Sequence, residues 1–330
     1  MSDVLKSTGG KPKFRHPRGL YVLFSAEMWE RFSYYGMRAI LILFMTTDAA
    51  QEGLGLTTET AGAVYGLYTA SVYLMTLPGG WLADNVFGQR KAVFYGGVLI
   101  MIGHLILAIP GSPIIFFTGL AFVALGTGLL KGNISTLVGE LYENEDGAKR
   151  DAGFSIFYMG INLGSFVGQI LVPLLAEYNW HLGFGLAAVG MLLGLISYKL
   201  FAPKYLGDIG MVPKVKQLEK IGKSNTKGTY AIVAIVLVLL VVLQFTGSID
   251  VTTATGIAQA LGLIIVVITM GYFLNILFNG GLSVLDKKKV SVIFILFVGI
   301  AIFWSGFEQA ASSLNLFARD FTDRFIGDWE

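Results

Sequence analysis

The sequence predicts an all-α polytopic membrane protein with about nine transmembrane helices. Hydrophobic residues make up 54% of the 330 residues and charged residues only 14%, whereas soluble domains carry roughly 25% charged residues. The mean hydropathy is +0.67. The apolar residues also gather into long runs, and a helix needs about 20 such residues to cross a bilayer. Composition and run length together exclude a soluble globular domain.

Polar segments separate the apolar runs into successive predicted spans. These are placed at about 19–46, 60–83, 92–109, 114–139, 153–175, 182–201, 229–246, 256–278 and 290–317. The first span contains charged side chains and is too long for a cleaved signal peptide. The spans over 229–246 and 256–278 contain no charged residue, so we expect them to form a lipid-facing hairpin.

The distribution of positive charge predicts that the amino terminus is cytoplasmic. With that orientation, the four outer loops contain no lysine or arginine, and the inner segments contain most of the 24. Such a bias is what the positive-inside rule requires. We expect an integral membrane protein.

The same pattern divides the chain into regions. They are a cytoplasmic tail over 1–18, a six-helix bundle over 19–201, a basic cytoplasmic linker over 202–228, an inserted transmembrane hairpin with its inner loop over 229–289, and the first helix of a second bundle over 290–330. An inner start followed by nine spans would leave the carboxyl end outside, and we expect the chain to be a fragment of a longer protein.

A polar stripe runs along the first span, on one helical face about 140° wide. Its members are Glu27, Glu30, Arg31, Tyr34, Tyr35 and Arg38. Charged side chains are costly in lipid, so this face fits the wall of an aqueous path. Arg31 can pair with Glu27 four residues earlier, which would leave Glu30 to pair elsewhere.

Charged side chains in other spans lie at matching depths. At a rise of about 1.5 Å per residue, Glu30 and Lys131 lie about 17 Å and about 12 Å from the inner face, and could meet there. Arg38 and Glu308 lie about 28 Å and about 27 Å from that face. An ion pair between them could form a gate that breaks when Glu308 takes a proton. The alternative is that these charges only hold helices together.

The segment between the second and third spans resembles the inner loop motif of the major facilitator superfamily. The matching residues are Gly80, Asp84, Gly88, Arg90 and Lys91. Glycines permit a tight turn and close helix approach, and Asp84 can accept a hydrogen bond from a helix end or from Arg90. The alternative is an ordinary positively charged inner loop with one acid.

Three further elements resemble those of proton-dependent oligopeptide transporters. They are Glu27–Gly36, which matches E-x-x-E-R-F-x-Y-Y-G, Phe157–Ser165 in the fifth span, and Phe307–Ser313 in the last span. Their order and spacing resemble a bacterial-type member of that family, with its extra helix hairpin. The resemblance implies an integral protein of a bacterial inner membrane. The family's last five spans have no counterpart here, so we expect residues 1–330 alone not to transport.

The resemblance implies a major facilitator-type helical bundle that imports di- and tripeptides with protons by alternating access. It assigns proton coupling and gating to Glu27, Glu30, Arg31, Arg38 and Glu308. It assigns peptide binding to Arg31, Tyr35, Arg38, Tyr73, Lys131, Asn162, Trp304 and Glu308. Lys131 and Arg31 would receive the peptide carboxylate and Asn162 its backbone. For Lys131, Tyr73 and Trp304, the alternatives are a lysine extended toward the interface and ordinary aromatic packing.

Some animal members of that family carry a proton-binding histidine in the second span, where this chain has Gly66. Proton coupling would therefore depend on carboxylates. His104 lies in the middle of the third span, and we expect it to be a hydrogen-bonded interior residue rather than a proton relay.

Nothing in the sequence indicates an enzyme, a metal site, a cofactor or nucleic-acid binding. The expected partners are peptides, protons and membrane lipid, with the proton as coupling ion. Two alternatives stay open: a transporter of nitrate or another organic anion with the same fold, and a membrane receptor that senses peptides without transporting them.

Overall fold

The computed structural model describes residues 16–213, 238 and 242–323, and these residues contain helices and no strand. Six of the described helices are long and apolar enough to cross a membrane. The first helix is also long, but it carries the charged stripe. The predicted span over 229–246 lies largely outside the described residues, so the count of about nine spans stays a prediction.

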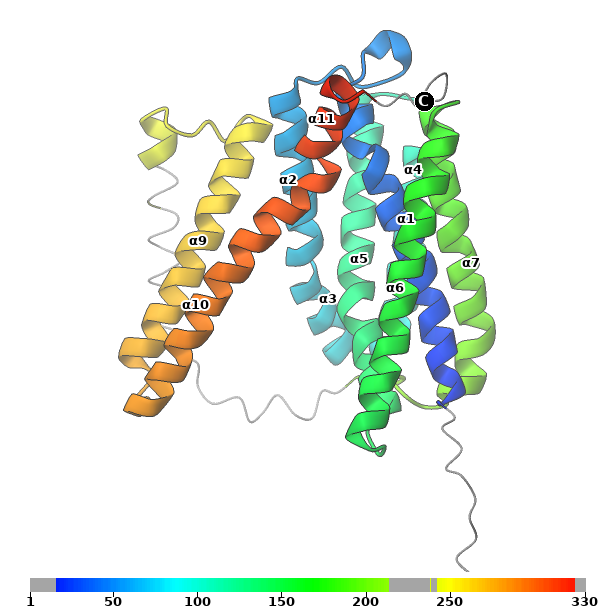
Figure 1. Cartoon of the computed structure of the whole chain (residues 1–330), viewed down its shortest axis with the longest axis vertical. Coiled ribbons are helices and arrows are strands. Elements are labelled where there is room, and N and C mark those ends of the chain that lie inside the picture. Colours follow the sequence, from blue (N-terminus) through cyan, green and yellow to red (C-terminus); the bar gives the residue numbers. More distant parts are fainter. Residues whose placement is uncertain (1–15, 214–237, 239–241, 324–330) are drawn as a thin grey trace, which may run out of the picture.

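The amino-terminal part of the chain forms one helical bundle (Figure 1). Its helices are α1 (Arg18–Thr46), α2 (Thr58–Leu74), α3 (Thr76–Leu82), α4 (Gln89–Leu107), α5 (Pro113–Leu141), α6 (Gly147–Ala176) and α7 (Trp180–Leu206). Helix α1 packs against α6 and α7, and α4 packs against α5 and α7. Buried apolar side chains such as Leu23, Met37 and Phe184 join these helices into a core. The polar stripe of α1 is therefore held in the interior.

Glycines let α6 approach α1 closely. A Cβ atom added to Gly160 would lie 2.8 Å from a ring carbon of Phe24, and one added to Gly164 would overlap the carbonyl of Met28. Gly168 faces the carbonyl of Phe32 in the same way. Small residues every four positions permit such contacts between membrane helices.

The inner loop motif is mostly helical rather than a loop. Helix α3 contains Gly80 and is followed by a turn of π-helix over Ala83–Phe87, and the chain reverses only at Gly88, whose φ is 78°. A Cβ atom on Gly80 would meet nothing within 4 Å, so the expected close approach is wrong at that position. Gly88 is required, because a left-handed φ suits glycine.

Of the two donors expected for Asp84, a helix end or Arg90, the described structure shows the helix end. Asp84 accepts a hydrogen bond at 2.8 Å from Nε2 of Gln89, the first residue of α4. The guanidinium of Arg90 donates to the carbonyl of Gly207, and its backbone N–H donates to the carbonyl of Gly210 at 2.9 Å. Arg90 thus ties the segment after α7 to the start of α4. Lys91 is exposed on α4.

The carboxyl-terminal helices stand apart from the bundle at one end and join it at the other (Figure 1). Helix α9 (Ala254–Asn279) contacts α10 (Val284–Phe307) through Phe273, whose ring centroid lies 5.0 Å from that of Phe294. Helix α9 also contacts α2. Among the described residues, α10 buries no side chain, which leaves an apolar surface suited to lipid or to further helices.

The predicted helix over 290–317 is interrupted. A 3₁₀ turn over Glu308–Ala311 follows α10, and Ser312 leaves the helical region before α11 (Ser313–Phe321) begins. The break turns the chain back onto α1, where Nδ2 of Asn315 donates to the carbonyl of Ala39 at 2.8 Å. Helices α7 and α10 also extend beyond their predicted spans, to Leu206 and from Val284.

Candidate functional site

Two carboxylates of α1 share one cation. Nε of Arg31 lies 2.7 Å from a carboxylate oxygen of Glu27 and 2.7 Å from one of Glu30. The Arg31–Glu27 pair is confirmed, but the expectation that Glu30 would pair elsewhere is wrong. All three side chains are buried, and a buried carboxylate needs a nearby cation. One guanidinium thus faces two carboxyl groups, and neither carboxylate oxygen of Glu30 has a hydrogen-bond partner among the described residues.

Lys131 does not form the expected ion pair with Glu30. Its Nζ lies 3.9 Å from the ring centroid of Tyr73, and no described carboxylate is within ion-pair distance of it. Close backbone approach between Gly79 of α3 and Gly128 of α5 brings these helices together. The ammonium of Lys131 is only partly buried and remains available to an anionic ligand.

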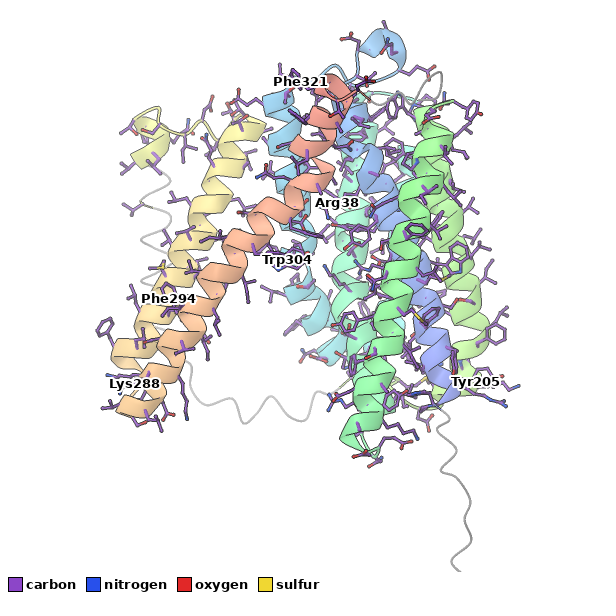
Figure 2. All side chains as sticks on the ribbon, viewed as in Figure 1. Arg38, Tyr205, Lys288, Phe294, Trp304 and Phe321 are labelled. Atoms are coloured by element: carbon purple, nitrogen blue, oxygen red, sulfur yellow. The ribbon has the colours of Figure 1, made fainter. Side chains whose placement is uncertain are left out.

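Arg38 joins α1 to the break after α10. Its guanidinium forms an ion pair with the Glu308 carboxylate and donates to the hydroxyl of Tyr65. The contact between Arg38 and Glu308 is therefore confirmed. Arg38 is buried, whereas 25% of the Glu308 side chain is exposed among the described residues. Figure 2 places Arg38 beside the junction of α10 and α11.

Aromatic rings surround the two arginines of α1. The guanidinium carbon of Arg31 lies 5.7 Å from the ring centroid of Tyr34, and that of Arg38 lies 6.0 Å from the centroid of Tyr35. Such contacts stabilise a cation by about 0.5–2 kcal/mol. Tyr35 thus lies beside Arg38, and Tyr73 beside Lys131; their place in the wall of a peptide cavity stays a prediction.

Sequence reasoning missed Tyr65 as a partner of Arg38. A signal was present, because Tyr65, Tyr68 and Tyr73 share one helical face about 140° wide. Tyr68 also stacks on Tyr34, with ring centroids 6.5 Å apart. A run of tyrosines on one face of a membrane helix is therefore informative when an arginine faces it.

Among the described residues, two predicted peptide-binding side chains form no hydrogen bond, ion pair or cation–π contact with these charged groups. Asn162 is exposed on α6. Trp304 lies one turn before Glu308, is 45% exposed, and packs against Phe303 and Phe307 with centroid distances of 5.7 Å and 5.2 Å. Figure 2 shows Trp304 on α10 at the side that faces the bundle. Their binding roles stay predictions.

His104 differs from its expected environment. It is fully buried in α4, and neither ring nitrogen has a hydrogen-bond partner among the described residues. His104 is therefore an interior residue as expected, but the expectation that it is hydrogen-bonded is wrong within the described residues. Within the described ranges, no group of three or more His, Cys, Asp or Glu side chains is placed to hold a metal ion.

The comparisons with known proteins give the family. A model of the POT family matches residues 90–330. The chain belongs to the POT family. It is 44% identical over 330 residues to the uncharacterized transporter YclF of Bacillus subtilis (strain 168), covering 99% of this chain and 65% of that protein. It is 42% identical to the peptide transporter YePEPT of Yersinia enterocolitica subsp. palearctica, covering 100% of this chain and 65% of that one.

A solved structure agrees in fold. The crystal structure of a mutant peptide transporter POT in complex with alafosfalin matches with a TM-score of 0.79 and 43% identity, covering 96% of this chain and 63% of that chain. The chain thus spans less than two thirds of the length of these relatives. Together with the six candidate spans, this membership makes it an integral membrane protein of the major facilitator type.

Proposed function

We propose that the chain provides the amino-terminal bundle and the start of the second bundle of a proton-coupled symporter for di- and tripeptides. Alternating access would expose the face of α1 to each side of the membrane in turn, with the amino terminus in the cytoplasm. A relative named as a peptide transporter and a peptide transporter structure support the substrate class. The proton is the coupling ion, and no cofactor or chemical step is proposed.

Peptide binding is proposed to use the cationic side chains of Lys131 and Arg31. All di- and tripeptides carry a carboxylate, so a cation that lacks an acidic partner can hold them whatever their side chains. Lys131 suits this role because it lies over Tyr73 rather than beside an acid. Arg31 would add attraction while holding Glu27 and Glu30. Asn162 and Trp304 would contact the peptide from α6 and α10.

Proton coupling is proposed to use the ion pair between Arg38 and Glu308, which is the observation that supports this function most directly. The pair joins α1 to the chain break after α10. Protonation of Glu308 removes its negative charge and therefore most of its attraction to Arg38. The two helices could then separate. Glu27 and Glu30 would relay the proton toward the inner side.

The test is dialanine uptake by the full-length gene product in liposomes with an imposed inward proton gradient. The Glu308→Gln variant should abolish uphill uptake and leave dialanine exchange measurable, because the neutral amide cannot titrate. Glu59→Gln, which changes an exposed acid at the start of α2, should transport normally. Unchanged uphill uptake by Glu308→Gln contradicts the coupling role.

The cationic side chains of Lys131 and Arg31 would also suit a small anion. Competition separates the candidates: an excess of dialanine should reduce labelled dialanine uptake, and an excess of nitrate should not. Inhibition of dialanine uptake by nitrate would favour an anion transporter. Dialanine binding without proton-linked uptake would favour a peptide-sensing receptor.

A further inference from the structure

A groove of about 370 Å³ lies between the first turns of α1 and the last turns of α7, away from the proposed peptide site. Its walls are Tyr21, Val22 and Ser25 from α1 and Ser197, Phe201 and Tyr205 from α7, with Arg18 at one end. Figure 2 shows Tyr205 at the lower end of the bundle, on the opposite flank from Lys288 at the foot of α10.

The floor of the groove is closed by direct helix contact. A Cβ atom on Gly19 would lie 2.7 Å from Cδ2 of Leu206 and 2.9 Å from the carbonyl of Tyr205. Nearer the membrane centre, the hydroxyls of Ser25 and Ser197 lie 3.1 Å apart. The two helices are therefore fixed relative to each other, and their packing forms the groove.

The outer wall is apolar and aromatic. The rings of Phe201 and Tyr205 stack with centroids 6.3 Å apart and an angle of 29° between their planes. Tyr21 is 55% exposed on the facing helix. Exposed aromatic side chains near the end of a membrane helix are typical of the level of the lipid headgroups. This wall suits an alkyl chain and not a polar ligand.

Arg18 lines one end of the groove, and Lys204 directly precedes the lining residue Tyr205 on α7. The guanidinium carbon of Arg18 lies 5.9 Å from the ring centroid of Tyr205, and Nζ of Lys204 lies 5.3 Å from the same centroid. Neither side chain has an acidic ion-pair partner among the described residues, and no described carboxylate lines the groove. Two cations near one ring, without an acid beside them, favour the approach of an anion.

We propose that this groove binds an anionic phospholipid. Its phosphate would contact Arg18 at the end of the groove and be attracted by the nearby Lys204, and one acyl chain would follow the wall formed by Phe201 and Tyr21. With the proposed orientation, this end of the bundle lies at the cytoplasmic side, where basic pockets between membrane helices favour such headgroups. The site depends on that orientation, but it is separate from the peptide site and does not depend on peptide transport.

The experiment is native mass spectrometry of the full-length gene product, purified in detergent, delipidated and titrated with phosphatidylglycerol or phosphatidylcholine. The unaltered protein should retain phosphatidylglycerol about tenfold more strongly. Arg18→Gln combined with Lys204→Gln should remove this preference. The matched control, Lys287→Gln combined with Lys288→Gln, removes two exposed lysines at the foot of α10 and should preserve it.

A second arm separates the lipid from its phosphate alone. Inorganic phosphate should not displace phosphatidylglycerol, because it has no acyl chain to occupy the apolar wall. Displacement of phosphatidylglycerol by inorganic phosphate overturns the proposal. Equal retention of both lipids by the unaltered protein also overturns it, and this comparison does not depend on the folding of any variant. Full retention by the Arg18–Lys204 double variant, or equal loss in the lysine control, also overturns it.

Discussion

At the residue scale, the two cations on the inner half of the site differ in their surroundings. Arg31 is buried and pairs with both Glu27 and Glu30, each at 2.7 Å. Lys131 lies over an aromatic ring and pairs with no described acid. Arg31 is therefore required to keep two carboxylates in the interior, whereas Lys131 can exchange its surroundings for a ligand at low cost.

We expect Arg31→Gln and Lys131→Gln to separate stability from binding. Arg31→Gln leaves two buried acids without a cation and should lower the free energy of unfolding by about 3–5 kcal/mol. Lys131→Gln removes one cation–π contact and should cost only about 1 kcal/mol while abolishing detectable dialanine binding. Thermal unfolding and equilibrium binding measure the two effects. Equal destabilisation by both variants would contradict the distinction.

The hydroxyl of Tyr65 is expected to stabilise the guanidinium of Arg38, which donates to it. Tyr65→Phe leaves a buried donor without its acceptor and should destabilise the protein by about 1–3 kcal/mol. Tyr68→Phe is the matched control, because the buried Tyr68 hydroxyl has no hydrogen-bond partner among the described residues. Thermal unfolding should show a loss for Tyr65→Phe and little change for Tyr68→Phe; the reverse order would refute the assignment.

At the element scale, helix contacts depend on glycines at particular positions rather than on glycine content. Along α6, Gly164 and Gly168 face carbonyl groups of α1. In α2, Gly62 faces open space, since an added Cβ atom would meet nothing within 4 Å. The position of α1, and with it the orientation of the charged stripe, is therefore set by the small residues of α6.

Alanine substitutions at these glycines should have opposite effects. Gly164→Ala places a methyl group against the Met28 carbonyl and should destabilise the protein by about 1–3 kcal/mol through overpacking. Gly62→Ala meets no such contact, and it should be neutral or stabilise the helix by up to about 1 kcal/mol. Unfolding in detergent at increasing temperature compares the two. A stable Gly164→Ala variant would show that α1 and α6 can move apart without cost.

At the scale of the whole molecule, α11 closes the end of the bundle near the carboxyl terminus of α1. Asn315 donates to the Ala39 carbonyl at 2.8 Å, and Nη1 of Arg319 donates to Oγ1 of Thr46 at 2.9 Å. These contacts lie beyond the ion pair between Arg38 and Glu308. If the proposed gate opens by moving α11 together with α10, these contacts must break.

A covalent link between α1 and α11 should therefore stop transport. These 330 residues contain no cysteine, so Ala39→Cys with Asn315→Cys introduces a defined pair. In a cysteine-free version of the full-length gene product, a short thiol cross-linker should abolish dialanine uptake, and reduction of a cleavable linker should restore it. Asn315→Cys alone, treated with the same cross-linker, is the control and should remain active. Full uptake by the linked Asn315 pair would exclude separation of α11 from α1.

Local sequence patterns predicted much of the fold and part of the site. Hydrophobic runs located the helices, and helical periodicity placed Glu27, Arg31 and Arg38 on one face. The depth estimate brought Arg38 to Glu308, because helices that cross the same membrane share one depth scale. It failed for Glu30 and Lys131, since depth alone does not say which neighbour a flexible side chain selects.

The sequence by itself determined the all-helical membrane fold, the POT resemblance and the charged stripe, because these follow from composition, period and motif order within single segments. Only the tertiary structure decided which groups meet. It assigned Glu30 to Arg31, Lys131 to Tyr73 and Tyr65 to Arg38. It also broke the last predicted span at Ser312. The physical reason is that a buried charge must be compensated by whatever partner packing places within reach, and packing joins segments far apart in the chain.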